Sequence, residues 1–518
     1  MSQRMFGLET EHAFVALDKH GKSLDKGAAI ERLMNTARRI LRHLPDAHHG
    51  GLFLQNGSCL YIDCGLHPEL ATPECTTPWE AVRYLLAGER IMASIADDMV
   101  ASDDQTAEAF FFRCNVDYSG VTTTWGCHES YLHQADPAAV GREILPHLVS
   151  RIIYTGAGGF DNTTPGLRFV ISPRVPHLVK ETSASSTGER GIFHTKDEPL
   201  CRGGYHRLHV LSGESMCSQT GSFLKVGCTA LIVAMIEAGL QPAEGIYLQS
   251  PLDAMRRFAS DMTCSAAVPS TAGKLLKATD IQRRYLEVAE AHLGNRFMPD
   301  WAPQVCEEWR AILDRIDAGS PNSIATTIDW AIKLALYKAY VASCGLDPAA
   351  LLRGCATLPN PPSQPQVMRT LLGTLPNQSP VRELRADTPD DVRARGLRGK
   401  CFEIDMRFGQ CGDGGVFAAM DRAGVLDHRV PGVDDIEGAM TDPPAVGRAH
   451  VRGECVRRFA NANGRYMCDW SFVSDAQAGA IIDLADPWAE DETWRTSGPV
   501  SAIIRPRARV MRGPHVVP

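Results

Sequence analysis

Two carboxylates near the start of the chain, Glu9 and Glu11, are spaced so that both can face one cavity. They lie in residues 5–17, where apolar and polar residues alternate in part, and this alternation indicates a β-strand. Side chains two positions apart in a strand point to the same side. Carboxylate oxygens are the ligands that Mg²⁺ prefers, and Mg²⁺ neutralises the charge of a triphosphate. The spacing suggests magnesium and nucleotide chemistry, but alone it fits a solvated sheet face better.

A second segment offers further oxygen-bearing side chains. Residues 53–64 also read as extended, with Tyr61 and Asp63 on one face, and Glu69 follows after a turn. If this segment lies beside the first, all five groups can converge. The hypothesis then becomes a metal site with a carboxylate available for proton transfer.

The elements that must position these groups can be read from apolar spacing. Helical spacing covers residues 28–44, 79–100, 138–153, 222–238, 281–293, 303–316 and 325–344, and strand-like stretches cover 110–116, 166–172 and 205–212. The strands are not separated by regular helical crossovers. This favours an antiparallel sheet with helices packed around it over a doubly wound parallel sheet. We therefore expect an α+β fold.

The best domain boundary is at residues 358–395, where NPPSQPQ is followed by polar and charged residues without a sustained period. We expect a catalytic domain in residues 1–395 that ends in this linker, and a small C-terminal domain in residues 397–487. Residues 488–518 form a basic tail, and 494–518 contain five arginines and no acidic residue. The tail is either solvated or a contact for an acidic partner.

Bulk properties exclude several classes of protein. The 518 residues carry a net charge of -8, which gives no reason to expect a nucleic-acid partner. The first residues hold carboxylates where a signal peptide needs apolar side chains, and the best apolar run, 226–235, is too short to span a bilayer. Sixteen cysteines without a CxxC pair favour buried small side chains. We expect a cytoplasmic protein with no membrane partner.

Longer motifs carry a family resemblance. GLETEH at residues 7–12, NGSCLYIDCGLHPELATPEC at 56–75 and GCHESYL at 126–132 are followed in order by TKDEP at 195–199, HRLHV at 206–210 and RGECVRRF at 452–459. Together they resemble the signatures of the Pup ligase and Pup deamidase family, whose members belong to the glutamine-synthetase-like carboxylate-amine ligases. Collinear agreement over most of a chain is far more specific than any one short motif.

The resemblance implies a fold and a set of roles. The expected fold is a curved antiparallel sheet of the glutamine-synthetase type with packed helices, plus a small C-terminal domain. Asp63 is the implied catalytic carboxylate, and ATP and Mg²⁺ are the implied cofactors. The implied metal ligands are Glu9, Tyr61 and Glu69, with Glu11 and His128 beside them, and the implied nucleotide contacts are Thr72, Trp470, Arg207 and Arg452. Glu129 and His209 are second-tier candidates in the same motifs.

The function implied is ligation by way of an acyl phosphate. A C-terminal glutamate of a small Pup-like protein modifier would be activated by ATP and joined to a lysine or other amine of a protein substrate. Asp63 would deprotonate the incoming ammonium group. Two alternatives remain: an amide hydrolase of the deamidase or depupylase type that uses the same aspartate with bound nucleotide, and a catalytically silent nucleotide-binding protein.

The chain departs from the family pattern at several positions. Cys59 stands where the family has an arginine associated with nucleotide binding, and a thiol cannot make a charge-assisted phosphate contact. We therefore expect either a compensating arginine or altered nucleotide handling. Leu70 replaces the tyrosine of HPEY, and residues 200–202 replace HAD.

Overall fold

The computed structural model describes residues 4–118, 123–164, 167–184, 189–194, 200–319, 321–343, 352–353, 390–460, 462 and 464–496, with the side chains of 352–353 and 390–396 left out. Nearly all of the expected linker, the TKDEP motif and most of the basic tail lie outside the described residues.

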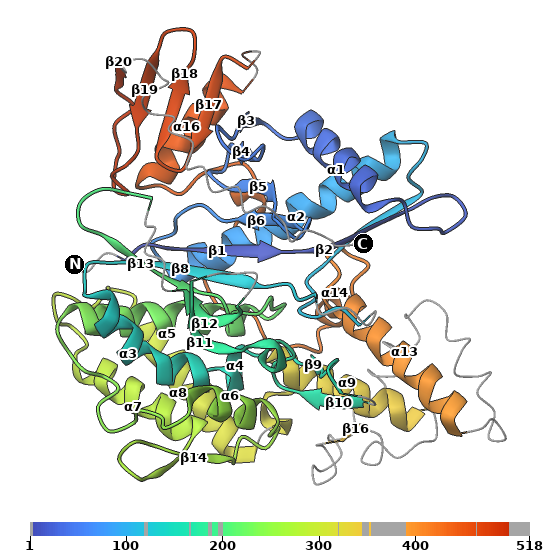
Figure 1. Ribbon diagram of the computed structural model, residues 1–518, viewed down its shortest axis with the longest axis vertical. Coiled ribbons are helices and arrows are strands. Elements are labelled where there is room, and N and C mark those ends of the chain that lie inside the picture. Colours follow the sequence, from blue (N-terminus) through green and yellow to red (C-terminus); the bar gives the residue numbers. More distant parts are fainter. Residues whose placement is uncertain are drawn as a thin grey trace, which may run out of the picture.

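A nine-stranded sheet crosses the middle of the molecule (Figure 1), in the order β11-β12-β13-β8-β1-β6-β5-β4-β3. Neighbouring strands are antiparallel except β11 and β12. The strands are β1 Phe6–Glu11, β3 His43–Pro45, β4 Leu52–Leu54, β5 Cys59–Ile62, β6 Pro68–Ala71, β8 Cys127–His133, β11 Lys180–Ser183, β12 Gly191–His194 and β13 His206–Val210. The prediction of an α+β fold around a large antiparallel sheet is confirmed.

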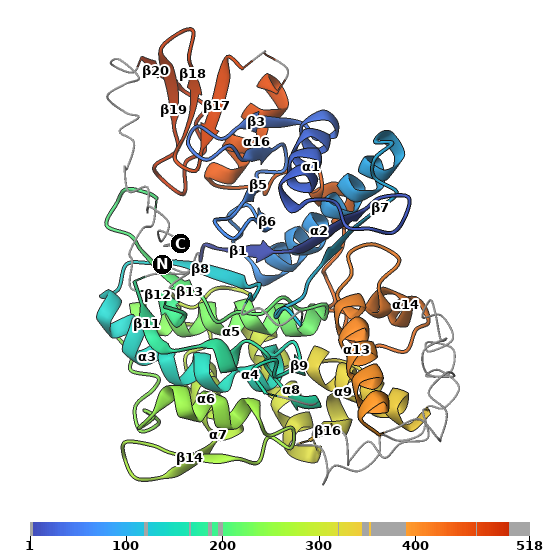
Figure 2. The same cartoon turned by 45° about the vertical axis from the view of Figure 1, so that its right-hand side comes forward.

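Helices cover one face of this sheet (Figures 1 and 2). They are α1 Lys26–Ile40, α2 Pro78–Ser102, α3 Pro137–Ser150, α4 Ile152–Thr155, α5 Gln219–Glu237, α6 Pro251–Ala259, α7 Ala278–Ala291, α8 Ala302–Gly319 and α9 Asp329–Ser343. Contacts of α5 with β8, α3 with β13 and α2 with β1 join this layer to the sheet. The main hydrophobic core lies between them.

The central helix of this layer, α5, is longer than the apolar run expected from the sequence. By length and composition it could span a bilayer, but its whole apolar stretch is buried inside the protein. Residues on every side of the helix are buried, because α2, α3, α7 and α8 all pack against it. Its apolar character therefore has a structural explanation in the core.

Shorter strands complete the main part. The ribbon of β2 Ala13–Leu17 and β7 Glu108–Phe112 extends from the end of β1. The small sheets are β9 Gly159–Phe160 with β10 Leu167–Val170 and β16 Leu352–Arg353, and β14 Ala267–Pro269 with β15 Leu275–Lys277.

The C-terminal part has a hydrophobic cluster of its own. Helix α16, Arg448–Phe459, packs with a four-stranded antiparallel sheet above β3, β4 and β5 (Figure 2). The four strands are β17 Tyr466–Asp469, β18 Phe472–Asp475, β19 Ala480–Asp483 and β20 Trp494–Thr496. This part and the central sheet form the two walls of the cavity described below.

The expected start of a C-terminal domain at residue 397 falls inside the main core. Helices α13 Asp390–Phe408, α14 Val416–Arg422 and α15 Ile436–Ala439 contribute Leu397, Cys401 and Phe408 among other residues to that core. The apolar side of α13 pairs with α9 and α14 rather than with α16. The strand-rich part with separate packing therefore begins near α16.

A tight turn between β4 and β5 brings α16 close to the sheet. Gly57 has φ of +84°, and an added Cβ atom would lie 3.1 Å from the carbonyl oxygen of Ala449. Glycine fits this left-handed position without strain. The side-chain amide of Asn56 donates to the carbonyl of Ala439 at 2.9 Å, which fixes the turn on the main core.

Candidate active site

The sheet face that the helices leave uncovered collects the predicted chemical groups. Glu9 lies opposite His128, and Glu69 lies opposite both Glu11 and Tyr61. Directly opposed residues of antiparallel strands share a face. The spacing within each strand and the pairing between strands thus bring all five groups to one side of the sheet.

Glu9 is the centre of a first group of ligand atoms. Its carboxylate oxygens lie 3.6 Å from His209 Nε2, 3.9 Å from His128 Nδ1 and 3.9 Å from Arg207 Nη1. Ligand atoms of Glu9, His128 and His209 all lie within 4.8 Å of one another, as a metal site requires. His209 was only a second-tier candidate, although the alternation in HRLHV already places it on the same face as Arg207.

The ionisation states of Glu9 and His128 suit them to bind a cation. Burial opposes the ionisation of Glu9, but contact with His209 and the charge of Arg207 hold the pKa of Glu9 well below its ordinary value. Burial, His209 and Arg174 lower the pKa of His128 to about 3. Glu9 is therefore an anion and His128 a neutral imidazole, the forms in which each can bind a metal.

Asp63 follows β5 in a tight loop that leads into β6. The backbone amide of His67 donates to Asp63 Oδ1 at 2.6 Å, and His67 Nδ1 lies 3.1 Å from Asp63 Oδ2. Burial opposes ionisation of Asp63, but the hydrogen bonds and charge of His67 and a hydrogen bond from Glu11 lower the pKa of Asp63. Asp63 is therefore an ionised carboxylate that can accept a proton.

Glu11 joins Asp63 and His67 in a second group whose ligand atoms lie within 4.8 Å of one another. Burial raises the pKa of Glu11, and the charge of Asp63 acts in the same direction. Glu11 also accepts a hydrogen bond from the backbone amide of Gly126 at 2.5 Å. The sequence analysis did not single out His67, whose position shows only once the loop is folded.

Glu69 and Tyr61 lie on the same sheet face, between the group around Glu9 and the group of Glu11, Asp63 and His67. Burial and the negative charges of Glu9 and Glu11 raise the pKa of Glu69 well above its ordinary value. Burial also raises the pKa of Tyr61, which hydrogen-bonds to Glu69 as a neutral phenol. Three carboxylates, those of Glu9, Glu11 and Glu69, lie close together on this face, and a divalent cation would relieve their repulsion. Their oxygen atoms are donors of the kind that fit Mg²⁺.

A cavity adjoins this cluster, between the central sheet and the C-terminal part. Its lining includes Glu9, Tyr61, Thr72, Arg207, Arg448 and Trp470. Thr72 is held by the backbone amide of Leu8, which donates to its hydroxyl at 3.1 Å. The ring of Trp470 packs edge-on against Phe53, with ring centres 5.1 Å apart. The cavity therefore joins the acidic cluster to an aromatic wall.

The two arginines of α16 occupy different places. Arg452 is completely buried; it donates to the carbonyl of Gly57 at 3.1 Å and to the carboxylate of Glu74, and its guanidinium lies 4.8 Å from the centre of the Trp470 ring. Arg452 lies behind the cavity wall and holds Trp470 in place, rather than lining the cavity as a nucleotide contact would. Arg448, one helical turn earlier, does line it.

Cys59 lies on the same strand face as Tyr61 but is enclosed. It packs with Phe53 and Cys468 in the C-terminal hydrophobic cluster, near Arg452. Burial raises the pKa of the Cys59 thiol well above its ordinary value, so it behaves as a small apolar side chain. No phosphate contact comes from this position.

Glu129 is placed on the opposite face. It is fully buried against the helices, where Arg151 Nη2 lies 2.5 Å from Oε1 and the hydroxyl of Tyr131 donates to Oε2 at 2.6 Å. The second-tier expectation of a functional role is not supported, because alternation along β8 turns Glu129 away from His128. Its ion pair holds the sheet on the helical layer.

Sequence comparisons place these features in a family context. The family model for the Pup-ligase protein matches residues 4–353 and 375–474. A Pup–protein ligase of Actinosynnema mirum is 32% identical over 95% of this chain and 98% of its own length. A Pup–protein ligase of Nakamurella multipartita is 31% identical over 94% of this chain and 97% of its own length.

Solved structures show the same architecture. The crystal structure of the complex between the prokaryotic ubiquitin-like protein Pup and its ligase PafA superposes with a TM-score of 0.74 at 24% identity, over 95% of this chain and 91% of that chain. The Pup ligase PafA in complex with ADP superposes with a TM-score of 0.66 at 25% identity, over 90% and 92% of the two chains. The expected fold, a large antiparallel sheet with packed helices and a strand-rich C-terminal part, is thus the fold of these Pup ligase structures.

Proposed function

The chain belongs to the Pup-ligase family, and we propose that it is an ATP-dependent carboxylate-amine ligase that joins a Pup-like modifier to lysine side chains. The observation that carries the proposal is the meeting of three features on one sheet face. These are an ionised aspartate held by His67, a crowded set of metal-binding groups around Glu9, and an adjoining cavity with an aromatic wall. Ligation needs all three.

ATP activates the modifier. A carboxylate is a poor acylating agent, so the side-chain carboxylate of the terminal glutamate attacks the γ-phosphorus of ATP, giving an acyl phosphate and ADP. We propose that Arg207, which lines the cavity and lies 3.9 Å from Glu9, binds phosphate oxygens through its forked donors. The reaction consumes one ATP for each bond formed.

Asp63 prepares the amine. A lysine ammonium must lose a proton before its nitrogen can attack, and Asp63 is an ionised acceptor fixed by two contacts from His67. The neutral amine then attacks the acyl carbon, phosphate leaves, and an isopeptide bond forms. The hydrogen bonds from His67 keep the carboxylate of Asp63 in one orientation for this step.

Mg²⁺ supplies charge neutralisation for the phosphates when it is bound. We propose that Glu9, Tyr61 and Glu69 hold it, together with Glu11, His128 and His209. The convergence of Glu69 with Glu9 and Glu11, which raises the pKa of Glu69, supports a cation there. We propose Thr72 and Trp470 as nucleotide contacts at the other end of the cavity.

The cytoplasm is the compartment we propose for this activity, because ATP and protein lysines meet there. The cysteines support it: buried cysteines such as Cys59, Cys217 and Cys468 are free thiols. Free thiols persist in a reducing compartment.

One experiment tests the function directly. Purified protein is incubated with ATP, Mg²⁺ and a Pup-like modifier ending in glutamate, with cell extract as the lysine source, and the products are analysed by mass spectrometry. We expect modifier remnants on lysines, formed only when ATP is present. Release of ammonia from a modifier ending in glutamine, without lysine adducts, would instead establish the hydrolase alternative.

A further inference from the structure

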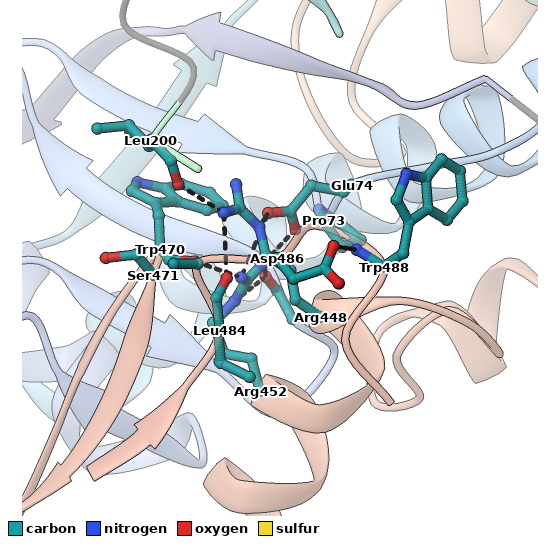
Figure 3. Close-up of polar contacts among 12 residues, drawn as sticks. Pro73, Glu74, Leu200, Arg448, Arg452, Trp470, Ser471, Leu484, Asp486 and Trp488 are labelled. Carbon is teal, nitrogen blue, oxygen red and sulfur yellow. Dashed lines mark hydrogen bonds and ion pairs between the residues drawn. The ribbon is translucent and has the colours of Figure 1, made fainter. Parts of the chain in front are cut away.

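Three walls of the cavity meet at one side chain, Arg448 at the start of α16 (Figure 3). Its Nε donates to Glu74 Oε1 at 2.6 Å, and its Nη1 donates to the carbonyls of Leu200 at 2.7 Å and Leu484 at 3.3 Å. Glu74 follows β6, Leu200 precedes β13 and Leu484 follows β19. Arg448 thus fastens the central sheet, the loop before β13 and the C-terminal sheet to one another.

The remaining terminal nitrogen of Arg448, Nη2, is left for a ligand. Within the described part of the chain it has no hydrogen-bond partner, and in Figure 3 it carries no dashed line. Arg448 is only 6% exposed, yet it lines the cavity. A guanidinium nitrogen in such a place is costly unless water or a ligand accepts its hydrogen bond.

The charge around Arg448 favours an anionic ligand. Arg448 and Arg452 share the single carboxylate of Glu74. Burial opposes ionisation of Glu74, but the charges of Arg452 and Arg448 lower the pKa of Glu74 to about 2, so the group holds two cations and one anion. Because Arg452 is enclosed, the excess positive charge faces the cavity at Arg448.

The distance between Arg448 and the metal-binding end indicates which part of the nucleotide Arg448 would contact. Its partner Glu74 lies five residues beyond Glu69, in a segment whose next residue, Cys75, pairs with Phe6. At about 3.3 Å for each extended residue, Glu74 is roughly 16 Å from Glu69, and it is roughly 10 Å from Glu9 at the metal-binding end, because Glu9 pairs with Ala71. A triphosphate held at that end places the nucleoside and α-phosphate beside Trp470 and Arg448.

We propose that Arg448 binds the AMP half of the nucleotide through Nη2, with Glu74 as the residue that positions its guanidinium. It thereby supplies the cationic contact that Cys59 cannot make. The identity of the ligand as an adenine nucleotide rests on the proposed function. The orientation of the guanidinium rests only on the three hydrogen bonds, one of which is also the ion pair with Glu74.

Calorimetry with three probes tests this assignment: ADP with Mg²⁺, AMP, and inorganic pyrophosphate with Mg²⁺. In Arg448→Met we expect ADP and AMP affinities to fall about 10- to 100-fold, the range for a lost charge-assisted hydrogen bond. Pyrophosphate stands in for the β- and γ-phosphates alone and leaves the α position empty, so its affinity should stay at the wild-type value. A matched control is Arg202→Met, which breaks an ion pair with Asp483 in the same interface but lines no part of the cavity; all three affinities should be unchanged.

Two results would overturn the assignment: ADP binding by Arg448→Met at wild-type strength, or an equal loss for pyrophosphate, which would mean that the whole site had collapsed. If Arg448→Met does not fold, Arg448→Lys serves instead. A lysine keeps the charge and can pair with Glu74, but its single ammonium lacks the fork, so AMP affinity should still fall at least about tenfold; wild-type AMP affinity in this variant contradicts the proposal. Wild-type protein that binds no nucleotide would remove the proposed function as well.

Discussion

Glu9 and Glu129 are carboxylates on neighbouring strands of one sheet, separated by a single step in register and facing opposite sides. Glu129 lies opposite Leu8, and Glu9 lies opposite His128. On the helical side, Arg151 and Tyr131 satisfy Glu129 completely within the protein. On the open side, Glu9, Glu11 and Glu69 crowd together, and burial with like charges raises the pKa of Glu69.

The difference teaches how one sheet separates stability from function. A buried ion pair with all its hydrogen bonds needs nothing from outside, and removing one partner leaves an unpaired charge. A crowded acidic face remains incomplete until a cation binds. Mutations on the open face should therefore reduce activity, whereas mutations on the helical face should reduce stability. Both expectations can be tested.

The largest effect is expected on the open face. Asp63→Asn keeps the shape of the side chain but removes the proton acceptor, so ligation should slow by about a hundredfold or more. The variant should fold and retain ADP. Initial rates of adduct formation and ADP calorimetry measure the two properties, with Asp434→Asn, a 78% exposed carboxylate, as the control. A wild-type rate for Asp63→Asn would remove Asp63 from the mechanism.

On the helical face the expected loss is in stability. Arg151→Met leaves Glu129 charged and unpaired in the core, which should lower the free energy of unfolding by about 3 to 5 kcal/mol. Denaturant titration measures the change. Arg458→Met, which breaks an exposed pair with Glu492, should cost less than about 1 kcal/mol. Equal losses in the two variants would show that Glu129 is not held as the structure indicates.

A smaller effect links pH to metal binding. In the metal-free protein the pKa values of Glu69 and Glu11 are raised above their unfolded values, so ionising these groups opposes folding. The penalty is present at neutral pH and is relieved as the pH falls through the raised pKa values. A fixed concentration of Mg²⁺, a hundred times its Kd at pH 7.5, should therefore stabilise the fold by about 2.7 kcal/mol at pH 7.5 and by less at pH 5, where binding is weaker.

Thermal unfolding with and without Mg²⁺ at the two pH values gives this comparison. A larger stabilisation at pH 5 than at pH 7.5 would mean that the raised pKa values do not belong to the metal site. Glu9→Gln serves as the matched variant, since it removes a metal ligand while keeping the shape of the side chain.

Alternation along single strands made part of this site predictable from the sequence. The spacing of Glu9 and Glu11, and of Tyr61 and Asp63, already fixed which side chains share a face. The register between strands was not predictable, because it depends on turns and on packing against the helices. His209 and His67 therefore gained their places beside Glu9 and Asp63 only in the folded structure.

Tertiary packing decided the remaining points. Arg448 and Arg452 are four residues apart and share one face of α16, so the sequence could not tell which one reaches the cavity. The boundary near residue 397 was inferred from composition, which does not reveal that the apolar residues of α13 join the main core. The structural role of Glu129 could not be predicted from the sequence, because its partner Arg151 lies 22 residues away along the chain.

The measurement that tests the central claim most directly is ADP binding by wild type and Glu9→Ala, each with and without Mg²⁺. Glu9 joins the acidic cluster to the cavity and lies within 4 Å of His128, Arg207 and His209. We expect wild-type binding to depend on Mg²⁺ and Glu9→Ala to weaken it by about tenfold or more, since a charged ligand of the metal is lost. Equal, magnesium-independent affinity in both proteins would contradict a magnesium–nucleotide site on the open face of the sheet.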